Sequence, residues 1–552
     1  MNLSKWWKSG APWIWLNAGA ISISIIMVFG LLALILARGF GHFWPHPVIS
    51  TTYAVPGSPV QTVVGQLRKS ETLTAQNLRD AGVPLPPEQQ FATRHLFRLA
   101  NRDVTGRDFV YFVDDYLGEY QYPPTMTVLE RREWGNFFGG PVRLLEGDRV
   151  IAEGDAVWPQ LQARIARANS LQSEIEQIQR HEIGNINYRL ERVRLDQRRA
   201  ELDEALTPAV EQALAERRAA LQAEYDAVQK RLNTLIADSQ RDKVVMRTGE
   251  GEEATIGLNM VVKAWQPNAM SVVEKVGFYA QAFFEFIFGY PREANTEGGI
   301  FPAIFGTVVM VLVMSIIVTP FGVLAAIYLR EYARQGPLLK AIRISVYNLA
   351  GVPSIVFGVF GLGFFVYVMG GMIDRAFYPE GLPAPTFGTP GLFWASLTLA
   401  LLTLPVVIVS TEEGLARIPS TIRQGSLALG ATKSETLWKV VVPLATPAMM
   451  TGLILAIARA AGEVAPLMLV GVVKLAPTLP IDGNFPFIHL ERKIMHLGFH
   501  IYDVGFQSPH AEAAEALVYA TSLILVLLIV ALNLSAILIR NHLREKYRVE
   551  SD

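Results

Sequence analysis

The sequence predicts a mainly α-helical membrane protein with six transmembrane helices and an extracytoplasmic β-rich domain, into which an antiparallel coiled-coil hairpin is inserted. Three observations support this fold class. Six apolar runs are long enough to cross a hydrocarbon core of about 30 Å, which takes about 20 helical residues. A polar segment with strand-like patterns separates the first run from the other five. Within that segment lies a stretch rich in Ala, Leu, Glu, Gln and Arg with a heptad repeat.

The composition is that of a chain that is partly membrane-embedded and partly soluble. Of its 552 residues, 51% are hydrophobic and 18% are charged, and the net charge is −1. A net charge so close to zero does not indicate a nucleic-acid partner. Cysteine is absent, which excludes disulfides, thiolate catalysis and thiolate metal sites.

The first apolar run, about residues 13–37, follows Lys5 and Lys8. It is too long for an ordinary signal-peptide core, and no small-residue cleavage signal follows it directly. We therefore expect residues 1–40 to form a retained transmembrane anchor with a cytoplasmic N-terminus.

Residues 41–159 are predicted to form the first part of the β-rich domain. Strand patterns occur at residues 109–113 and 126–130, and a hairpin pattern turns at Gly147-Asp148. Strand-like sequence resumes at 254–265, within a return segment at 242–270. The simplest interpretation is one β-domain interrupted by a helical insert.

The insert, residues 160–241, is predicted to be a coiled-coil hairpin that folds back at Pro208. Its second half repeats an apolar residue every seven positions, at Leu214, Leu221, Val228 and Leu235. This stripe either packs against the insert's own first helix, which is the favoured interpretation, or binds another protein.

The remaining chain is predicted to contain an interfacial helix at 271–298 and a membrane core at 299–540, followed by a cytoplasmic tail at 541–552. The apolar side of 272–288 is interrupted by charged residues, so this helix is expected to lie on the membrane rather than cross it. Five spans are expected at about 300–328, 345–369, 392–410, 447–473 and 517–539.

Positive charges place the same side of each span in the cytoplasm. They fall in the loop after the second span, in the loop 411–443 and in the tail, at Arg330, Arg334, Lys340, Arg343, Arg417, Arg423, Lys433, Lys439, Arg540, Arg544, Lys546 and Arg548. Both termini are therefore expected in the cytoplasm and the large insert in the periplasm.

Three spans contain helix-breaking residues. Thr319-Pro320 is expected to interrupt the second span and Gly351-Val352-Pro353-Ser354 the third, while Pro466 falls late in the fifth. Such breaks are tolerated where other helices or a water-lined cavity satisfy the freed carbonyls. We therefore expect a translocation path that includes Pro353 and Ser354.

The fifth span carries Arg459, with Glu463 four residues later on the same helix face. A charge at mid-membrane costs at least about 2.5 kcal/mol. Arg459 is predicted to contact an anion in the translocation path, because a guanidinium matches phosphate oxygens with two parallel hydrogen bonds. The alternative is a structural ion pair, and both interpretations stay open.

Residues 411–443 form a polar, basic loop between two spans. Its apolar spacing predicts two short helices that turn at Gly430, with Ser434 as the N-cap of the second helix and Pro443 as its end. Gly425, Gly430 and Lys433 resemble a phosphate-binding loop, but that loop needs a lysine where Ala431 stands, so the chain is not expected to bind ATP.

This loop resembles the coupling loop of ABC-importer permeases, whose pattern is Glu-Ala-Ala, three residues, Gly, nine residues and Ile-x-Leu-Pro. Those places hold Gln424, Gly425, Ser426, Gly430, Val440, Val442 and Pro443. The spacing, the Gly and the Pro are retained, whereas the Glu-Ala-Ala triplet is not. Segments such as NLAGVPSIVFGVFGLG and ILAIARAAGEVAPLMLVG further resemble the PstA family of phosphate permeases, and the resemblance covers about residues 299–540.

The resemblance implies a type I-like permease that forms half of a phosphate pathway in the bacterial inner membrane. It implies a PstC-like permease partner, two PstB-like ATPase subunits and a PstS-like phosphate-binding protein, and it suggests a PhoU-like regulator. ATP would be used by the ATPase subunits, and no cofactor is expected on this chain.

Two other functions remain as alternatives: a permease for another oxyanion such as sulfate or molybdate, and a membrane-anchored coiled-coil sensor or scaffold. The nine histidines form no metal-binding or catalytic sequence motif. The chain is therefore expected to be a transport subunit rather than an enzyme.

Overall fold

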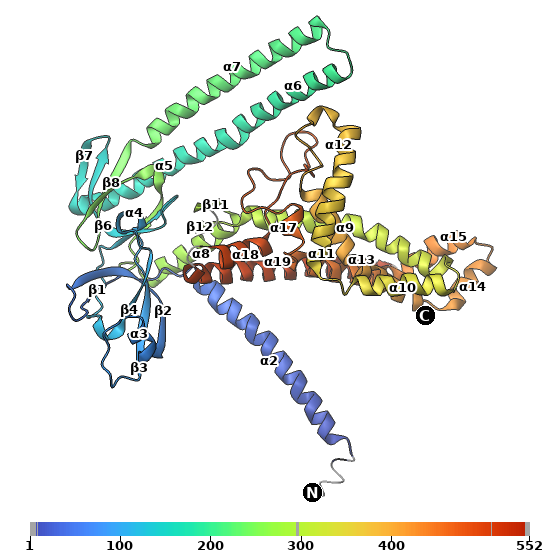
Figure 1. Ribbon diagram of the computed structural model, residues 1–552, viewed down its shortest axis with the longest axis horizontal. Coiled ribbons are helices and arrows are strands. Elements are labelled where there is room, and N and C mark those ends of the chain that lie inside the picture. The colour runs from blue at the N-terminus through green and yellow to red at the C-terminus, as the bar shows by residue number, and fades with distance from the viewer. Residues whose placement is uncertain (1–6, 8, 294–296, 509–510, 547–552) are drawn as a thin grey trace.

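A computed structural model shows a helical core with a β-domain at one end and a pair of long helices reaching over the core (Figure 1). The structure describes residues 7, 9–293, 297–508 and 511–546. The predicted cytoplasmic charges Lys5, Lys8 and Arg548 lie outside the described residues, as does the end of the predicted tail.

Six helices are long and apolar enough to cross a membrane, as predicted. They cover Pro12–Gly41, Phe301–Tyr332, Ser354–Phe377, Leu392–Ala416, Lys433–Gly462 and Ala514–Leu543. They are built from α2 (Ala11–Gly41), α9 (Phe301–Ile327) with η6 (Tyr328–Tyr332), α11 (Ser354–Phe360) with η7 (Gly361–Gly370) and α12 (Gly371–Phe377), α13 (Leu392–Ala416), α15 (Lys433–Thr436) with η9 (Leu437–Val441) and α16 (Val442–Gly462), and α19 (Ala511–Lys546).

Helix α13 is the central element of the core. In its most apolar stretch of 18 residues, 67% of the residues are buried, whereas 0% are buried in the corresponding stretch of α2. Helix α13 packs against both α9 and α16. Small residues allow this close packing. A Cβ atom added at Gly452 of α16 would lie 2.6 Å from Cβ of Ser410 on α13. The same addition at Gly322 of α9 would lie 2.6 Å from a methyl carbon of Val407.

The expectation that Thr319-Pro320 interrupts the second span is wrong, because α9 runs through Pro320 without a break. Two hydroxyl groups instead bond to carbonyls one turn back. Thr319 Oγ1 donates to the Ser315 carbonyl at 2.7 Å, and Ser315 Oγ donates to the Val311 carbonyl at 2.7 Å. Proline is tolerated in membrane helices where such side chains and neighbouring helices satisfy the backbone.

The bounds of the third and fifth spans also differ from the prediction. The third begins at Ser354, because a break at residues 350–353 separates it from α10 (Pro337–Leu349). The fifth begins at Lys433 and ends at Gly462, after which Glu463 adopts an extended conformation. Both breaks coincide with expected ones, at Gly351-Val352-Pro353-Ser354 and before Pro466, but average hydropathy does not show that a span ends there, because the residues on both sides are apolar.

The β-rich domain contains a four-stranded and a six-stranded antiparallel sheet. The first follows the order β1-β2-β3-β4, and the second follows β10-β5-β6-β8-β9 with β7 paired to β6. Their strands are β1 (Ile49–Tyr53), β2 (Gln61–Thr74), β3 (Phe91–Arg98), β4 (Phe109–Val113), β5 (Thr127–Arg131), β6 (Phe137–Glu146), β7 (Arg149–Glu153), β8 (Asp242–Arg247), β9 (Glu253–Gly257) and β10 (Val261–Trp265).

The helical insert lies between β7 and β8, so strands from both sides of it form the second sheet. Its outgoing arm is α5 (Val157–Gln177), a π-helical turn η3 (Ile178–Ile183) and α6 (Gly184–Leu202). Its returning arm is α7 (Pro208–Ser239), with Pro208 at the first turn. Val228 and Leu235 of the heptad stripe pack against the cluster that contains Ile175 and Ile178, so this part of the stripe faces the insert's own first arm.

The elements that connect these parts are short, apart from α8. They are α3 (Ala75–Asp80), α4 (Arg102–Thr105), α8 (Val272–Phe288), α14 (Ser420–Ala428), α17 (Leu467–Val470), α18 (Leu497–Gln507), η1 (Asp114–Tyr116), η2 (Gly154–Ala156), η4 (Leu258–Met260), η8 (Pro379–Gly381), β11 (Pro291–Arg292) and β12 (Glu297–Gly298). Helix α8 has the predicted bounds and begins with a capping box between Ser271 and Glu274.

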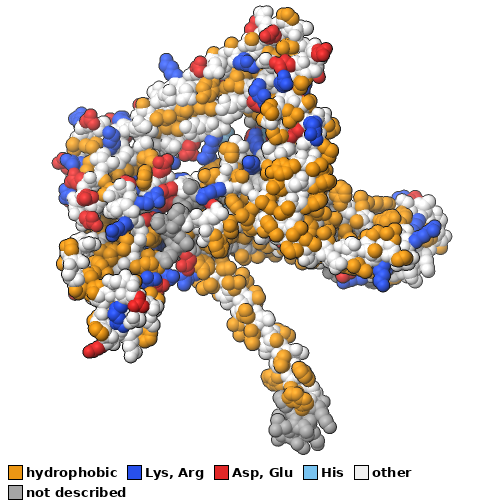
Figure 2. Space-filling model, in the orientation of Figure 1, with side chains coloured by type: hydrophobic (Ala, Val, Ile, Leu, Met, Phe, Trp, Pro, Cys, Tyr) orange, Lys and Arg blue, Asp and Glu red, His pale blue; other side chains and the backbone are white. Residues whose placement is uncertain are grey.

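Hydrophobic side chains cover α2 and the visible face of the core, whereas charged side chains gather on the β-domain, on the hairpin and at the end that carries α14 and α15 (Figure 2). The β-domain and the α14–α15 loop lie at opposite ends of the core helices (Figure 1). This is the arrangement expected when one end faces the cytoplasm and the other faces out.

Candidate functional site

The predicted coupling loop folds as two short helices, α14 and α15, joined at Gly430. The φ angle of Gly430 is 87°, in the left-handed region that residues with a side chain rarely adopt. A Cβ added there would meet no atom within 4 Å, so the backbone conformation alone selects glycine. Thr432 rather than Ser434 caps the second helix, with Glu435 completing the capping box, which corrects the predicted N-cap.

Pro443 does not end the second helix, contrary to the prediction. The chain remains helical from α15 through the π-helical turn η9 into α16, where Pro443 lies in the first turn. A π-helical turn changes the hydrogen-bond spacing and lets a helix continue past an irregular position. The loop is therefore continuous with the fifth span.

Arg423 holds α14 against the ends of two core helices. Its Nη2 atom lies 2.8 Å from Oε1 of Glu331 and donates to the Leu415 carbonyl at 2.8 Å, while Nη1 donates to the Ile418 carbonyl at 2.7 Å. Glu331 follows α9, and Leu415 lies in the last turn of α13. The pair is mostly buried, with 22% and 13% of the two side chains exposed.

Helix α15, the second half of the loop, also contacts the segment that follows α9, at Glu331 and Tyr332. Lys433 Nζ donates to the Glu331 carbonyl at 2.6 Å and lies 4.6 Å from the ring centre of Tyr332. Ser426 Oγ and Thr436 Oγ1 share a hydrogen bond of 2.9 Å that joins α14 to α15. The sequence interpretation used Arg423 and Lys433 as topology signals, and Lys433 in the comparison with a phosphate-binding loop, but local sequence gives no sign that they meet Glu331.

One face of the loop is apolar and exposed. Leu429 is 91% exposed, and Ile422, Leu427 and Trp438 are also exposed. The other face is buried, where Leu437 and Val441 pack with Ile327, Leu415 and Ile418. Several exposed apolar side chains close together in one loop and surrounded by polar residues are typical of a protein–protein interface.

The residues of the coupling pattern divide between these two faces. Gln424 and Gly425 are exposed, and Ser426 is half-buried through its bond to Thr436. Val440, Val442 and Pro443 are half-buried at the start of α16. The first group is available to a partner, whereas the second joins the loop to the core.

Arg459 and Glu463 form a contact in the structure, with Nε of Arg459 3.4 Å from Oε1 of Glu463. Arg459 lies in the last turn of α16, not in the middle of its helix as expected, and Glu463 lies just past the helix end. A cation in the last turn is favoured by the helix dipole. Among the hydrogen bonds of the described residues, neither Nη atom of Arg459 has a partner.

The non-helical segment after α16, residues 463–466, packs against the third span. A Cβ added at Gly358 would lie 2.6 Å from Cα of Pro466, so α11 packs directly on this break. Pro353 and Ser354 lie at the start of α11. In the described part of the chain, no hydrogen bond or ion pair joins them to Arg459 or Glu463, and the four residues are not brought together.

The helical insert contacts loops of the core at residues 380 and 484–485. Arg199 of α6 forms an ion pair with Glu380, which is almost completely buried in η8. Asn185 Nδ2 donates to Asn484 Oδ1 at 3.3 Å, and the Tyr188 hydroxyl donates to the Phe485 carbonyl. These contacts span 181 to 299 residues of sequence, and no sequence signal identifies them.

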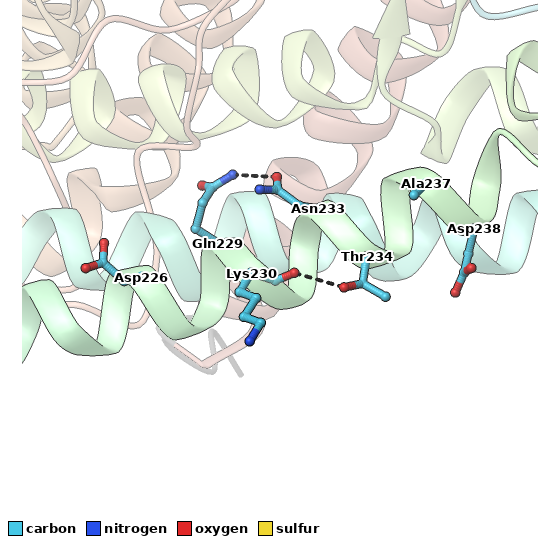
Figure 3. Close-up of a pocket in the computed structure, with 7 residues that line it drawn as sticks. All are labelled: Asp226, Gln229, Lys230, Asn233, Thr234, Ala237 and Asp238. Carbon is cyan, nitrogen blue, oxygen red and sulfur yellow. Dashed lines mark hydrogen bonds between the residues drawn. The ribbon is translucent and has the colours of Figure 1, made fainter.

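A depression on the returning arm of the insert does not form a site. Figure 3 shows its lining, which comes from α7 alone. Gln229 bonds to Asn233 at 3.0 Å, and Thr234 bonds to the Lys230 carbonyl at 3.1 Å, both within the helix. Within the described ranges, no group of three His, Asp or Glu side chains is placed to hold a metal ion.

Comparison with known proteins agrees with the arrangement of the core. The family described as "binding-protein-dependent transport system inner membrane component" matches residues 318–549. The phosphate transport system permease protein PstA of Mycobacterium leprae is 36% identical over 225 residues, which cover 40% of this chain and 68% of that protein. PstA of Yersinia pestis is 32% identical over 247 residues, which cover 45% and 74%.

The solved inward-facing structure of the MetNI methionine ABC transporter matches 44% of this chain and 94% of that chain, with 18% identity and a TM-score of 0.31. The PstA relatives match only part of this chain, so they give no information on most of the β-domain and the helical insert. Six apolar helices and this family make the chain a multi-pass membrane protein. The chain belongs to the PstA-like permeases of ABC transporters, within the family of binding-protein-dependent transport system inner membrane components.

Proposed function

We propose that the chain is the permease subunit of an importer for inorganic phosphate and forms half of its translocation pathway. The observation that carries this proposal is its 30–36% identity to several proteins named PstA, over two thirds or more of the length of three of them. A permease is a transport subunit, and ATP hydrolysis is assigned to separate ATPase subunits. We assign no cofactor to this chain.

The α14–α15 loop is proposed to couple those ATPase subunits to the pathway. Its exposed Ile422, Leu427 and Leu429 would enter a groove of the ATPase, as an apolar helix face does in other helix-in-groove contacts. Arg423 and Lys433 would carry a displacement of the loop to Glu331 at the end of α9. Continuity of α15 with α16 would carry the same displacement to the fifth span.

Arg459 is proposed to contact the anion during transport. Its two Nη atoms have no partner among the described hydrogen bonds, and they could donate together to two oxygens of one phosphate. Glu463, bonded to Nε, would fix the orientation of the guanidinium.

The family implies further permease and ATPase subunits and a binding protein. We propose that these are PstC-like, PstB-like and PstS-like, and that a PhoU-like regulator acts on the complex. We further propose the bacterial inner membrane as the location, with both termini in the cytoplasm and the β-domain and insert in the periplasm. The opposite placement of the β-domain and the coupling loop supports this orientation.

Uptake by reconstituted vesicles tests the proposal. Vesicles that hold the complete importer should accumulate labelled phosphate when ATP and the binding protein are supplied, and vesicles lacking this chain should not. Unlabelled sulfate and molybdate, added separately, test the alternative cargo. Strong competition by either anion, with none by phosphate, would identify another oxyanion importer.

A further inference from the structure

A large cavity lies where the β-domain meets the membrane core. Its volume is about 1410 Å³, and it is bounded by β2, β3, α8, α18 and the ends of α2 and α19. The C-terminal end of α2 reaches this junction (Figure 1). Ten Lys or Arg and eight Asp or Glu side chains line the cavity, so its polar wall has an excess of positive charge.

Arg68 projects into the cavity from an irregular position of the first sheet. Gln66 pairs with Arg98 across β2 and β3, and the register shifts between Leu67 and Lys69, which leaves Arg68 as the extra residue of a β-bulge. Bulges of this kind redirect a side chain and are frequent beside functional sites.

Gln66 fixes the direction of Arg68. It is only 4% exposed, and both ends of its amide are used. Its Nε2 atom donates to the His46 carbonyl at 3.0 Å, and its Oε1 atom accepts from Nη2 of Arg68 at 3.1 Å. A buried amide with both groups bonded holds the guanidinium in one place.

Arg68 differs from the other basic side chains of the cavity in its partners. Each of the other nine forms an ion pair with a carboxylate, whereas the described ion pairs do not include Arg68. Arg98, on the adjacent strand, is occupied by two carboxylates, since its Nε lies 3.6 Å from Asp108 and its Nη2 lies 3.0 Å from Glu297. Arg68 is exposed to the cavity; desolvation there and the neighbouring Arg98 lower its pKa to about 9, while Asp108 raises it, so Arg68 remains charged at neutral pH.

The opposite wall of the cavity is apolar and lies where membrane helices end. Aromatic side chains of α8 line it together with Trp44 and Leu517. Phe284 and Phe288 are 58% and 64% exposed, and Trp44 is 40% exposed. Trp44, just after the end of α2, is of the residue type enriched at the level of lipid headgroups, and the exposed phenylalanines of α8 form the apolar side of a helix expected to lie in that interface.

We propose that this cavity binds a phosphate group, with Arg68 as its ligand, and that the phosphate is the headgroup of an anionic phospholipid. A free phosphate ion would use the cationic wall alone. A phospholipid would use both walls, because its acyl chains would lie against the phenylalanines of α8 and the end of α2. The site is separate from the transport pathway of the core and binds without turnover.

Lipid retention by the purified full chain tests the proposal. The protein is washed free of lipid in detergent, incubated with vesicles of phosphatidylglycerol or phosphatidylethanolamine, repurified and analysed for bound phospholipid by mass spectrometry. The wild type should retain phosphatidylglycerol in preference to phosphatidylethanolamine. Arg68→Ala should reduce the retained amount about ten-fold, as expected for the loss of a charge-assisted hydrogen bond.

Arg149→Ala is the matched control, because Arg149 is an exposed arginine of β7 that does not line the cavity. It should retain lipid like the wild type. If Arg68→Ala is unstable, Arg68→Gln keeps most of the side-chain volume and should show the same loss. Equal retention by wild type, Arg68→Ala and Arg68→Gln would overturn the site.

Equilibrium dialysis with labelled inorganic phosphate separates the two sources of the phosphate group. Saturable binding to the lipid-free wild type that is lost in Arg68→Ala, together with no lipid retention, would overturn the lipid assignment in favour of the free ion. Absence of such binding, together with selective lipid retention, would support the lipid. Equal retention of both phospholipids would overturn the requirement for an anionic headgroup.

Discussion

The guanidinium of Arg423 and the carboxylate of Glu331 lie 2.8 Å apart, although 92 residues separate them in the chain. This pair joins the coupling loop to the end of α9, and two further bonds of Arg423 reach the segment that follows α13 and its last turn. The loop is therefore held by the core rather than merely placed beside it.

We expect Arg423→Ala to reduce phosphate uptake about ten-fold while the complex still hydrolyses ATP. Loss of a charge-assisted hydrogen bond costs about 1.5–3 kcal/mol, which would release α14 from α9. Uptake and ATPase activity measured on the same vesicles would show the uncoupling. Arg417→Ala is the control, since Arg417 is exposed and takes part in none of the described ion pairs. Equal uptake by both variants would refute a coupling role for the Arg423–Glu331 pair.

Gly430→Val should uncouple hydrolysis from uptake, because the left-handed conformation at this position costs a β-branched residue about 1–3 kcal/mol. Gly425→Ala provides a matched change in the same loop. Gly425 lies inside α14, where an added Cβ meets no atom within 4 Å, so alanine should be neutral or slightly stabilising. Normal uptake by Gly430→Val at normal membrane abundance would remove the basis for assigning the turn to coupling.

Arg459→Lys should impair uptake about ten-fold or more, because a point charge does not reproduce the two parallel donors of a guanidinium. Glu463→Gln should be milder, since an amide oxygen can still accept from Nε. Membrane abundance has to be measured beside uptake, because an unpaired charge destabilises assembly. If both single variants fail to assemble and exchange of the two residues restores assembly, the pair is structural and the anion role is wrong.

Arg199→Ala should loosen the core loop around η8. Glu380 is almost completely buried, and removal of Arg199 would leave its carboxylate without that partner. We expect a cost of about 1–2 kcal/mol, below that of a fully buried pair because Arg199 is half exposed. Hydrogen exchange of residues 379–388 should then accelerate about ten-fold. Arg198→Ala, which removes only a pair within α6, should leave that exchange unchanged.

Deletion of residues 160–241, bridged by a short flexible linker, is expected to leave membrane insertion and assembly of the core intact. The apolar clusters that include the insert join it to its own arms and to the second sheet, whereas its contacts with the core loops are an ion pair, two hydrogen bonds and a ring contact between Tyr188 and His489. Purification of the partner subunits with the shortened chain would measure assembly. Loss of the complex would mean that the insert is a partner interface.

Local sequence was sufficient where one segment carries its own signal. The hairpin at Gly147-Asp148 forms between β6 and β7, and α8 has the predicted bounds because Ser271 and Glu274 cap it. Six apolar runs became six long helices, since no water is present in a bilayer to satisfy an open backbone. Gly430 was identified because a glycine between two amphipathic segments indicates a turn with positive φ.

Other features could not be read from local patterns. Pro320 and Pro443 lie inside continuous helices, and a π-helical turn directly precedes the helix that contains Pro443. Thr432 and Ser434 lie two residues apart, and both residue types commonly cap helices. Only the folded backbone shows that Thr432 is the N-cap of α15.

The sequence by itself therefore determined the six spans, the β-rich domain with its helical insert and the two-helix loop that turns at Gly430, because helix length, strand alternation and turn chemistry are set by neighbouring residues. Tertiary structure alone decided that Arg423 meets Glu331, that Arg199 meets Glu380 and that Arg68 enters a cavity beside membrane helices. Each of these contacts joins segments that only the packing of the whole chain brings together. Charge and periodicity along the sequence do not specify which partner a long basic side chain will reach.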